Sequence, residues 1–176
     1  VFIAPGDTQM VSFVQDAFAL YVQRIVLVAG IIGIIGSIDH VDHHFPRRTG
    51  EYFLMILFSL IGMTVLAGAR DLVTLIVAFE LMGVPLYVLA AMAKKRSPLG
   101  IEGAWKLYLT GAVSSAITLY GMSFVVGVTN TVSIDVLAQT VSSGSPMVRL
   151  GMMLMLGGVG FKIGAVPFHM WVPDTY

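Results

Sequence analysis

Two charged residues, Glu80 and Lys162, each interrupt a long apolar stretch of this sequence. Charged groups inside a membrane are costly, and those that are tolerated usually face a protein interior or a water-filled path. An acid and a base in such a place can move protons, because a desolvated lysine holds its proton less tightly and a nearby carboxylate reverses that effect. We therefore interpret Glu80 and Lys162 as a proton site. The structural alternative is a buried ion pair that only fixes helix packing.

Pro85 and Pro167 each follow one of these two charges by five positions. Proline removes a backbone donor and disrupts a helix one turn earlier. The repeated spacing favours discontinuous helices that line a polar path beside the charges. The alternative is an ordinary kink, since proline is common in membrane helices.

Three further residues are candidates for the same path. Glu102 and Lys106 stand four positions apart with the acid first, which favours a helical ion pair. That pair either keeps Lys106 charged locally or leaves Lys106 as the neighbour of Glu80 in a proton relay. His169 follows Pro167 and is of the type that titrates near neutral pH, so a place on the path and a packing role both stay open.

Two other motifs have simpler interpretations. The segment Asp39–His44 has the composition of a metal site, but its spacing matches no metal motif and the surrounding residues indicate a solvated loop, so we predict no metal. The segment Gly157–Lys162 superficially resembles a phosphate loop, but no glycine directly precedes the lysine and no Ser or Thr follows it. We expect its glycines to permit close helix packing instead.

The composition is that of a membrane protein. Of the 176 residues, 57% are hydrophobic and only 11% are charged, whereas soluble domains carry about a quarter charged residues. The net charge of zero gives no field that would attract nucleic acid. The absence of cysteine excludes disulfides and thiolate metal sites within the sequence.

Five apolar runs have the length of about twenty residues that a bilayer crossing needs. They lie at about 17–38, 52–69, 72–93, 100–128 and 147–168. Only helices and closed barrels satisfy the backbone in lipid, and the alternation of a barrel is absent, so we predict an all-α, polytopic transmembrane helical bundle. A short surface helix is expected around Val132–Gln139. We expect residues 1–176 to be a single membrane domain and a fragment of a longer chain.

The basic residues of the short loops predict the orientation, because such residues collect on the cytoplasmic side. We assign the following basic residues to the cytoplasmic side: Arg47, Arg48, Lys94, Lys95 and Arg96. The third and fifth helices then run in parallel. At 1.5 Å per residue, Glu80 lies roughly 13 Å from Asp71 and Lys162 roughly 20 Å from Arg149. Both charges therefore fall in the middle third of the bilayer, which predicts that they pair.

Three segments resemble the antiporter-like, proton-pumping membrane subunits of respiratory complex I. Ala78–Tyr87 is similar to the glutamate-bearing fifth helix of that family, Glu102–Tyr108 to the start of its sixth, and Gly160–Asp174 to its broken seventh helix. Among the branches of the family, the pattern Glu-to-Pro-Leu-Tyr and the ending Pro-Asp-Thr-Tyr most resemble the bacterial N subunits.

The resemblance implies that the five helices are the third to seventh of about fourteen, in an inverted-repeat fold. It implies that Glu80 and Lys162 are a central acid–base pair with Lys106 beside it, and that the activity is proton translocation coupled to NADH:quinone oxidoreduction. FMN, iron–sulfur clusters and quinone would belong to other subunits, with no cofactor in this chain.

The resemblance also implies where the chain works. Its partners would be the other membrane-arm subunits, including other antiporter-like ones, and the lipid of a bacterial plasma (inner) membrane, with no nucleic acid. The alternatives are a subunit of a multisubunit sodium/proton antiporter, and a scaffold subunit that does not pump.

Overall fold

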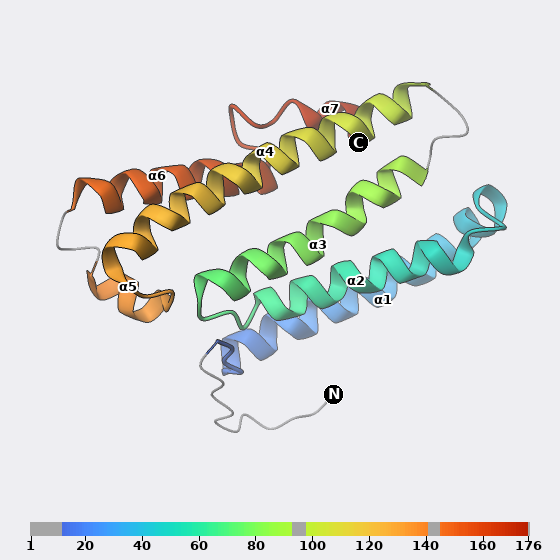
Figure 1. Ribbon diagram of the computed structural model, residues 1–176. Coiled ribbons are helices and arrows are strands. Elements are labelled where there is room, and N and C mark those ends of the chain that lie inside the picture. The colour runs from blue at the N-terminus through green and yellow to red at the C-terminus, as the bar shows by residue number, and fades with distance from the viewer. Residues whose placement is uncertain (1–11, 93–97, 141–144, 176) are drawn as a thin grey trace. The chain divides into compact units, whose positions relative to one another are not determined.

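The computed structural model describes residues 12–92, 98–140 and 145–175 of the chain (Figure 1). By its internal contacts the chain divides into two compact units, Val1–Leu89 and Ala90–Tyr176. The single membrane domain expected from the sequence stays a prediction. Lys94, Lys95 and Arg96, which the sequence assigns to the cytoplasmic side, lie outside the described ranges.

Five helices in the described ranges are long and apolar enough to cross a membrane. They are α1 (Ala17–His44), α2 (Thr49–Leu66), α3 (Leu72–Met92), α4 (Pro98–Thr129) and α6 (Pro146–Gly160), which continues into the 3₁₀ turn η3 (Phe161–Ile163). Two short helices, α5 (Ile134–Thr140) and α7 (Trp171–Thr175), complete the described elements, and α5 falls where a surface helix is predicted. The predicted all-α membrane fold is confirmed.

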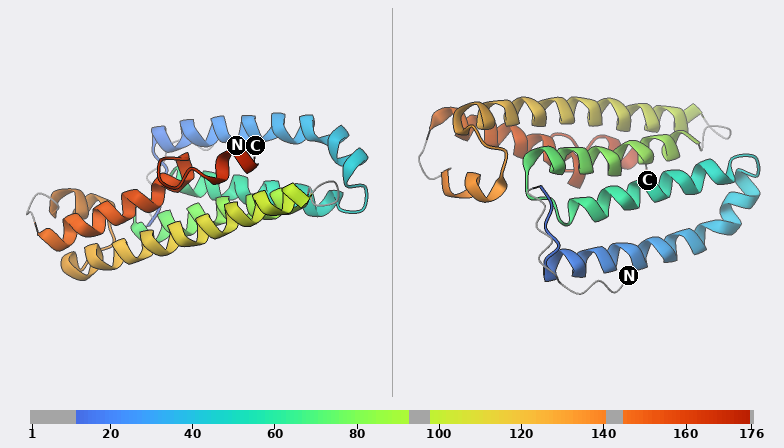
Figure 2. Two further views of the ribbon diagram at one scale, coloured as in Figure 1. Left: turned by 90° about the horizontal axis from the view of Figure 1, so that it is seen from above. Right: turned by 60° about the horizontal axis from the view of Figure 1, so that its bottom comes forward.

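In the first unit, α1 and α2 run side by side, as Figure 2 shows. They approach closely at Gly30, where an added Cβ would lie 2.6 Å from the Leu60 side chain. The Gln23 amide of α1 also donates to the Thr64 carbonyl of α2 at 3.1 Å. A small residue and a polar contact thus hold two otherwise apolar helices together, as is usual in lipid.

The second unit is built on the antiparallel pair of α4 and α6, which lie side by side (Figures 1 and 2). A Cβ on Gly121 would lie 2.5 Å from the Gly151 carbonyl oxygen, so the two backbones touch at that level. Seven residues away along each helix, the Ser114 hydroxyl donates to the Gly158 carbonyl. These two contacts fix the register along the whole pair.

The helices of the first unit meet at a polar junction between Ser12–Asp16 and Gly68–Asp71. Asp16 accepts from the Ala19 N–H at 2.7 Å, which caps α1, and from the Arg70 guanidinium at 2.8 Å. Asp71, only 6% exposed, accepts from the Thr74 N–H and hydroxyl at 2.8 and 2.7 Å. The junction satisfies the free N–H groups at the starts of α1 and α3.

The hydrogen bonds of Asp71 lower the pKa of its carboxyl. Burial alone would raise the pKa of its carboxyl, but hydrogen bonds from Thr74, Ser12 and Val73 outweigh burial and hold the pKa below its ordinary value of 3.8. The pKa is therefore lower in the folded than in the unfolded state. The stabilisation that follows is complete above the unfolded pKa and is lost as the pH falls through the folded pKa.

We expect Asp71→Ala to lower the free energy of unfolding by about 1 kcal/mol at pH 7, because the start of α3 loses its cap. The difference from the wild type should shrink as the pH falls below 3.8, where the native carboxyl begins to protonate. Thermal melting of the full-length subunit in detergent at pH 7 and pH 3 measures both effects. Asp42→Ala, on an exposed residue, is the control. An equal difference at the two pH values would contradict the assignment.

Candidate functional site

Glu80 lies in the middle of α3, and its side chain is half-buried. Its carboxylate interacts electrostatically with the Tyr87 side chain two turns further along the same helix. The predicted break at Pro85 is wrong, because α3 runs without interruption from Leu72 to Met92 with Pro85 buried inside it. Membrane helices tolerate proline where neighbouring groups satisfy the backbone around it.

Helix α2 supplies such groups directly beside Glu80. The Ser59 hydroxyl donates to the Met82 carbonyl at 3.0 Å. One turn along α2, a Cβ on Gly62 would lie 2.4 Å from the Met82 backbone nitrogen, so that only glycine allows this approach. The segment of α3 between Glu80 and Pro85 therefore rests on the backbone of α2. Ser59 and Gly62 thus support the candidate site, and neither was predicted from the sequence. Small residues at helical spacing are nevertheless a known packing signal.

Lys162 lies in η3, directly after α6. Its side chain is half-buried, its Nζ atom is buried, and that atom lies 5.5 Å from the centroid of the Phe161 ring. The predicted spanning helix at 147–168 ends earlier than expected, since regular helix stops at Gly160 and η3 at Ile163.

Gly164, and not Pro167, ends this helix. Gly164 has a φ of 65°, in the left-handed region that favours glycine. Its N–H bonds the Phe161 carbonyl at 3.0 Å, while the Ala165 N–H bonds the Gly160 carbonyl at 2.8 Å. This pair of bonds is the Schellman arrangement that closes helix C-termini. Pro167 follows in the exposed turn before α7. The expected break beside Lys162 is present, with a different residue as its cause.

The predicted ion pair of Glu102 and Lys106 is formed on α4. Its Oε1–Nζ distance is 2.7 Å, and the two side chains are 57% and 43% exposed. The register of α4 and α6 pairs residue 121 with 151 and 114 with 158, which extrapolates to 110 with 162. Lys106 then lies one turn from the level of Lys162, about 6 Å along the axis. Their levels thus allow Lys106 to act as the neighbour of Lys162.

His169 lies in the turn before α7, which packs against α4. Its carbonyl accepts the Val172 N–H at 3.0 Å, and its side chain is exposed. Glu80 belongs to the first unit, and both lysines belong to the second. The pairing of Glu80 with Lys162, and any proton-path role of His169, therefore stay predictions.

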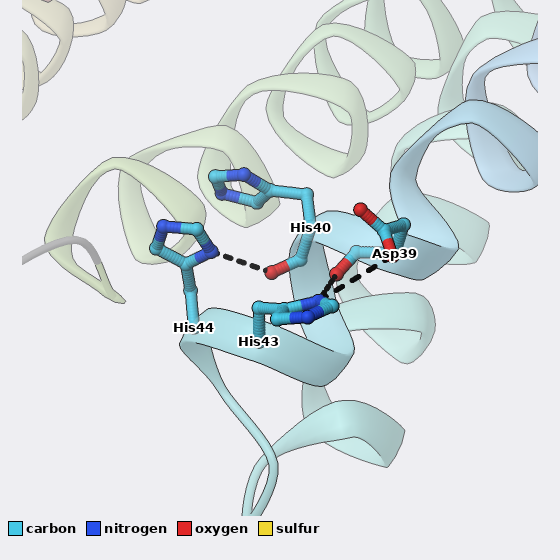
Figure 3. A network of polar contacts seen from close by, with 4 residues as sticks. All are labelled: Asp39, His40, His43 and His44. Atoms are coloured by element: carbon cyan, nitrogen blue, oxygen red, sulfur yellow. Dashed lines mark hydrogen bonds and ion pairs between the residues drawn. The ribbon is translucent and has the colours of Figure 1, made fainter.

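The histidine cluster is helical, so the predicted loop there is wrong. Helix α1 continues to His44, with the Nδ1 atoms of His43 and His44 at 2.8 and 2.9 Å from the carbonyls of Asp39 and His40 (Figure 3). The rings of His40 and His44 stack with centroids 4.2 Å apart. A protonated imidazole in the last turn of a helix also interacts favourably with the helix dipole. Among the described residues, no group of three or more potential metal ligands converges.

Residues 69–176, more than half of the chain, match the family described as "NADH:quinone oxidoreductase/Mrp antiporter, TM". The chain belongs to this family. The matched range contains Glu80, Lys162, the Glu102–Lys106 ion pair and the helix break at Gly164. The family match and the five apolar helices together indicate a multi-pass membrane protein.

Individual relatives agree with the family. The chain is 40% identical to "NADH-quinone oxidoreductase subunit N 2" of Rhizobium meliloti, over 93% of this chain and 34% of that protein. It is 42% identical to "F(420)H(2) dehydrogenase subunit N" of Methanosarcina mazei, over 73% of this chain and 26% of that protein. The chain thus spans about a third or less of the length of these relatives.

Solved structures support the fold. A chain of respiratory complex I from Thermus thermophilus matches with a TM-score of 0.77 and 30% identity, over 98% of this chain and 36% of that one. A chain of an archaeal membrane-bound sulfane sulfur reductase matches with a TM-score of 0.76 at 23% identity, over 90% of this chain and 32% of that one, which speaks for the fold alone.

Proposed function

We propose that this chain is the part of an N-type antiporter-like subunit of a proton-translocating NADH:quinone oxidoreductase that holds a buried acid–base pair, Glu80 and Lys162. The observation that carries the proposal is the place of these two charges. Each lies within a membrane-length helical segment, in the portion of the chain that matches the family. Ionisable groups inside membrane-spanning segments are functional sites by default.

The proposed mechanism is a proton relay. The Lys162 ammonium holds the proton, and the Glu80 carboxylate stabilises that charge when it is near. A change passed along the membrane arm withdraws this stabilisation, and the proton leaves by way of Lys106, one helical turn away in the register of α4 and α6. The Glu102 carboxylate, 2.7 Å from Lys106, compensates charge on that lysine.

The redox chemistry belongs to other subunits in this proposal. FMN supplies hydride chemistry, and iron–sulfur clusters supply one-electron transfer to quinone. Such clusters are held by cysteine thiolates, which the 176 residues do not contain. The partners are the other membrane-arm subunits, and the location is the bacterial plasma membrane.

A second candidate is a subunit of a multisubunit sodium/proton antiporter, because the family description includes Mrp antiporters. Purification of the full-length subunit with its partners separates the two. Hydrophilic redox subunits and NADH oxidation in the purified complex support the first function. A complex without them, in membranes that exchange sodium for protons, supports the second.

We expect Glu80→Gln to lower proton transfer through this subunit by at least about tenfold, because the neutral amide cannot alter the charge state of Lys162. The measurement is the number of protons moved per NADH oxidised in membrane vesicles that contain the assembled complex. Glu51→Gln, which removes an exposed carboxylate at the start of α2, is the matched control. Wild-type stoichiometry with Glu80→Gln in an intact complex would refute the role of Glu80.

A further inference from the structure

Phe161 connects Lys162 to the chain beyond the helix break. It is among the largest fully buried side chains of the described residues, with only 2% of its surface exposed. The Lys162 Nζ atom lies over its ring, 5.5 Å from the centroid. The Trp171 ring of α7 contacts the same ring, with centroids 5.2 Å apart and planes tilted by 49°. Phe161 therefore touches the central lysine and α7 at once.

The contact between the ring and the ammonium is attractive. A cation within about 6 Å of an aromatic centroid interacts with the negative face of the ring, and more strongly where water is excluded. The Nζ atom is buried, so the favourable case applies. The attraction at such a site corresponds to about a tenfold or larger change in an equilibrium constant. A neutral ring achieves this without adding a second group that exchanges protons.

The position of the Phe161 ring is set by α7, which follows the helix break at Gly164. The left-handed turn at Gly164 folds the chain back, so that a Cβ on Gly164 would lie 3.0 Å from Val172 Cγ2 in α7. Helix α7 in turn packs against α4. Trp171 is thereby held where its ring meets Phe161, and a shift of α7 would move the aromatic pair relative to the ammonium.

We propose that Phe161 is a positioning residue for proton transfer, whose ring holds the protonated form of Lys162 and is itself held by Trp171. The inference rests on the proposed function and extends it. It makes α7 the element through which a movement in the membrane arm changes how firmly Lys162 holds its proton.

The test replaces Phe161 by phenylalanines with one, two and three ring fluorines, in the full-length subunit within the assembled complex. Fluorine withdraws charge from the ring face while it nearly preserves ring shape, so proton transfer per NADH oxidised should fall stepwise, to about a tenth with three fluorines. Phe161→Leu should resemble the last member of the series.

The same fluorinated series at Phe124 is the matched control, because that ring packs on Tyr120 within α4. Unchanged proton transfer through the Phe161 series would overturn the proposal. A loss with Phe161→Leu alone would also overturn it, because shape and not the ring's charge distribution would then matter. Lys162→Ala separates the two levels: if that variant pumps normally, the proposed function itself has failed.

Discussion

Lys162→Ala is expected to abolish proton transfer through this subunit, a fall of at least about 100-fold, because it removes the proposed proton carrier. NADH oxidation in the assembled complex measures whether electron transfer continues, and proton uptake by the same vesicles measures translocation. The ratio of the two isolates the contribution of this subunit. The Nζ atom of Lys162 is buried beside the Phe161 ring. Alanine is too short to place any group at that position.

Lys162→Arg distinguishes a proton carrier from a charge that merely holds the fold. Arginine keeps a positive charge and its aromatic contact, but it does not release a proton under working conditions. A proton site predicts that Lys162→Arg fails as badly as Lys162→Ala. A structural ion pair predicts that Lys162→Arg is close to wild type. A Lys162→Arg variant that pumps normally would therefore favour the scaffold alternative.

The membrane-spanning elements were predictable from the sequence, because lipid leaves a long apolar segment no other way to bond its backbone than as a helix. The errors lie at helix ends and breaks. The polar segment after residue 38 indicates a loop, yet α1 continues to His44, and the rings of His43 and His44 bond the carbonyls one turn earlier. Pro85 is the more conspicuous helix breaker, yet α3 continues through it.

The ends of the fifth spanning segment show what sequence alone lacks. Gly157, Gly158, Gly160 and Gly164 lie within eight residues of one another, and nothing local marks Gly164 as the left-handed one. Its left-handed turn brings Val172 of α7 back beside it, a contact that the local sequence does not indicate. Likewise, Ser59 and Gly62 lie beside Glu80 only because α2 packs against α3 with these two residues in contact with Met82. The charges of the site were predictable because they are costly in lipid, whereas their supports are small and inconspicuous.

Gly158 supports the candidate site through the close contact of α6 with α4. A Cβ there would lie 2.0 Å from Thr118 Oγ1 and 2.6 Å from the Ser114 carbonyl oxygen, which belongs to the backbone of α4. The Gly158 carbonyl also accepts the Ser114 hydroxyl. Because a backbone atom cannot be moved aside as a side chain can, even alanine must push α6 away from α4. The same displacement shifts Lys162, one turn beyond Gly158, relative to Lys106.

We therefore expect Gly158→Ala to destabilise the subunit by about 1–3 kcal/mol, the usual cost of an overpacked interface. The control is its neighbour, because a Cβ on Gly157 meets nothing within 4 Å. Gly157→Ala should leave stability unchanged or raise it by up to about 1 kcal/mol, since alanine favours helix over glycine. Thermal melting of the full-length subunit in detergent compares the two, and the stoichiometry of proton transfer should fall only with Gly158→Ala. Equal behaviour of the two variants would show that the contact of α4 and α6 at this level does not position Lys162.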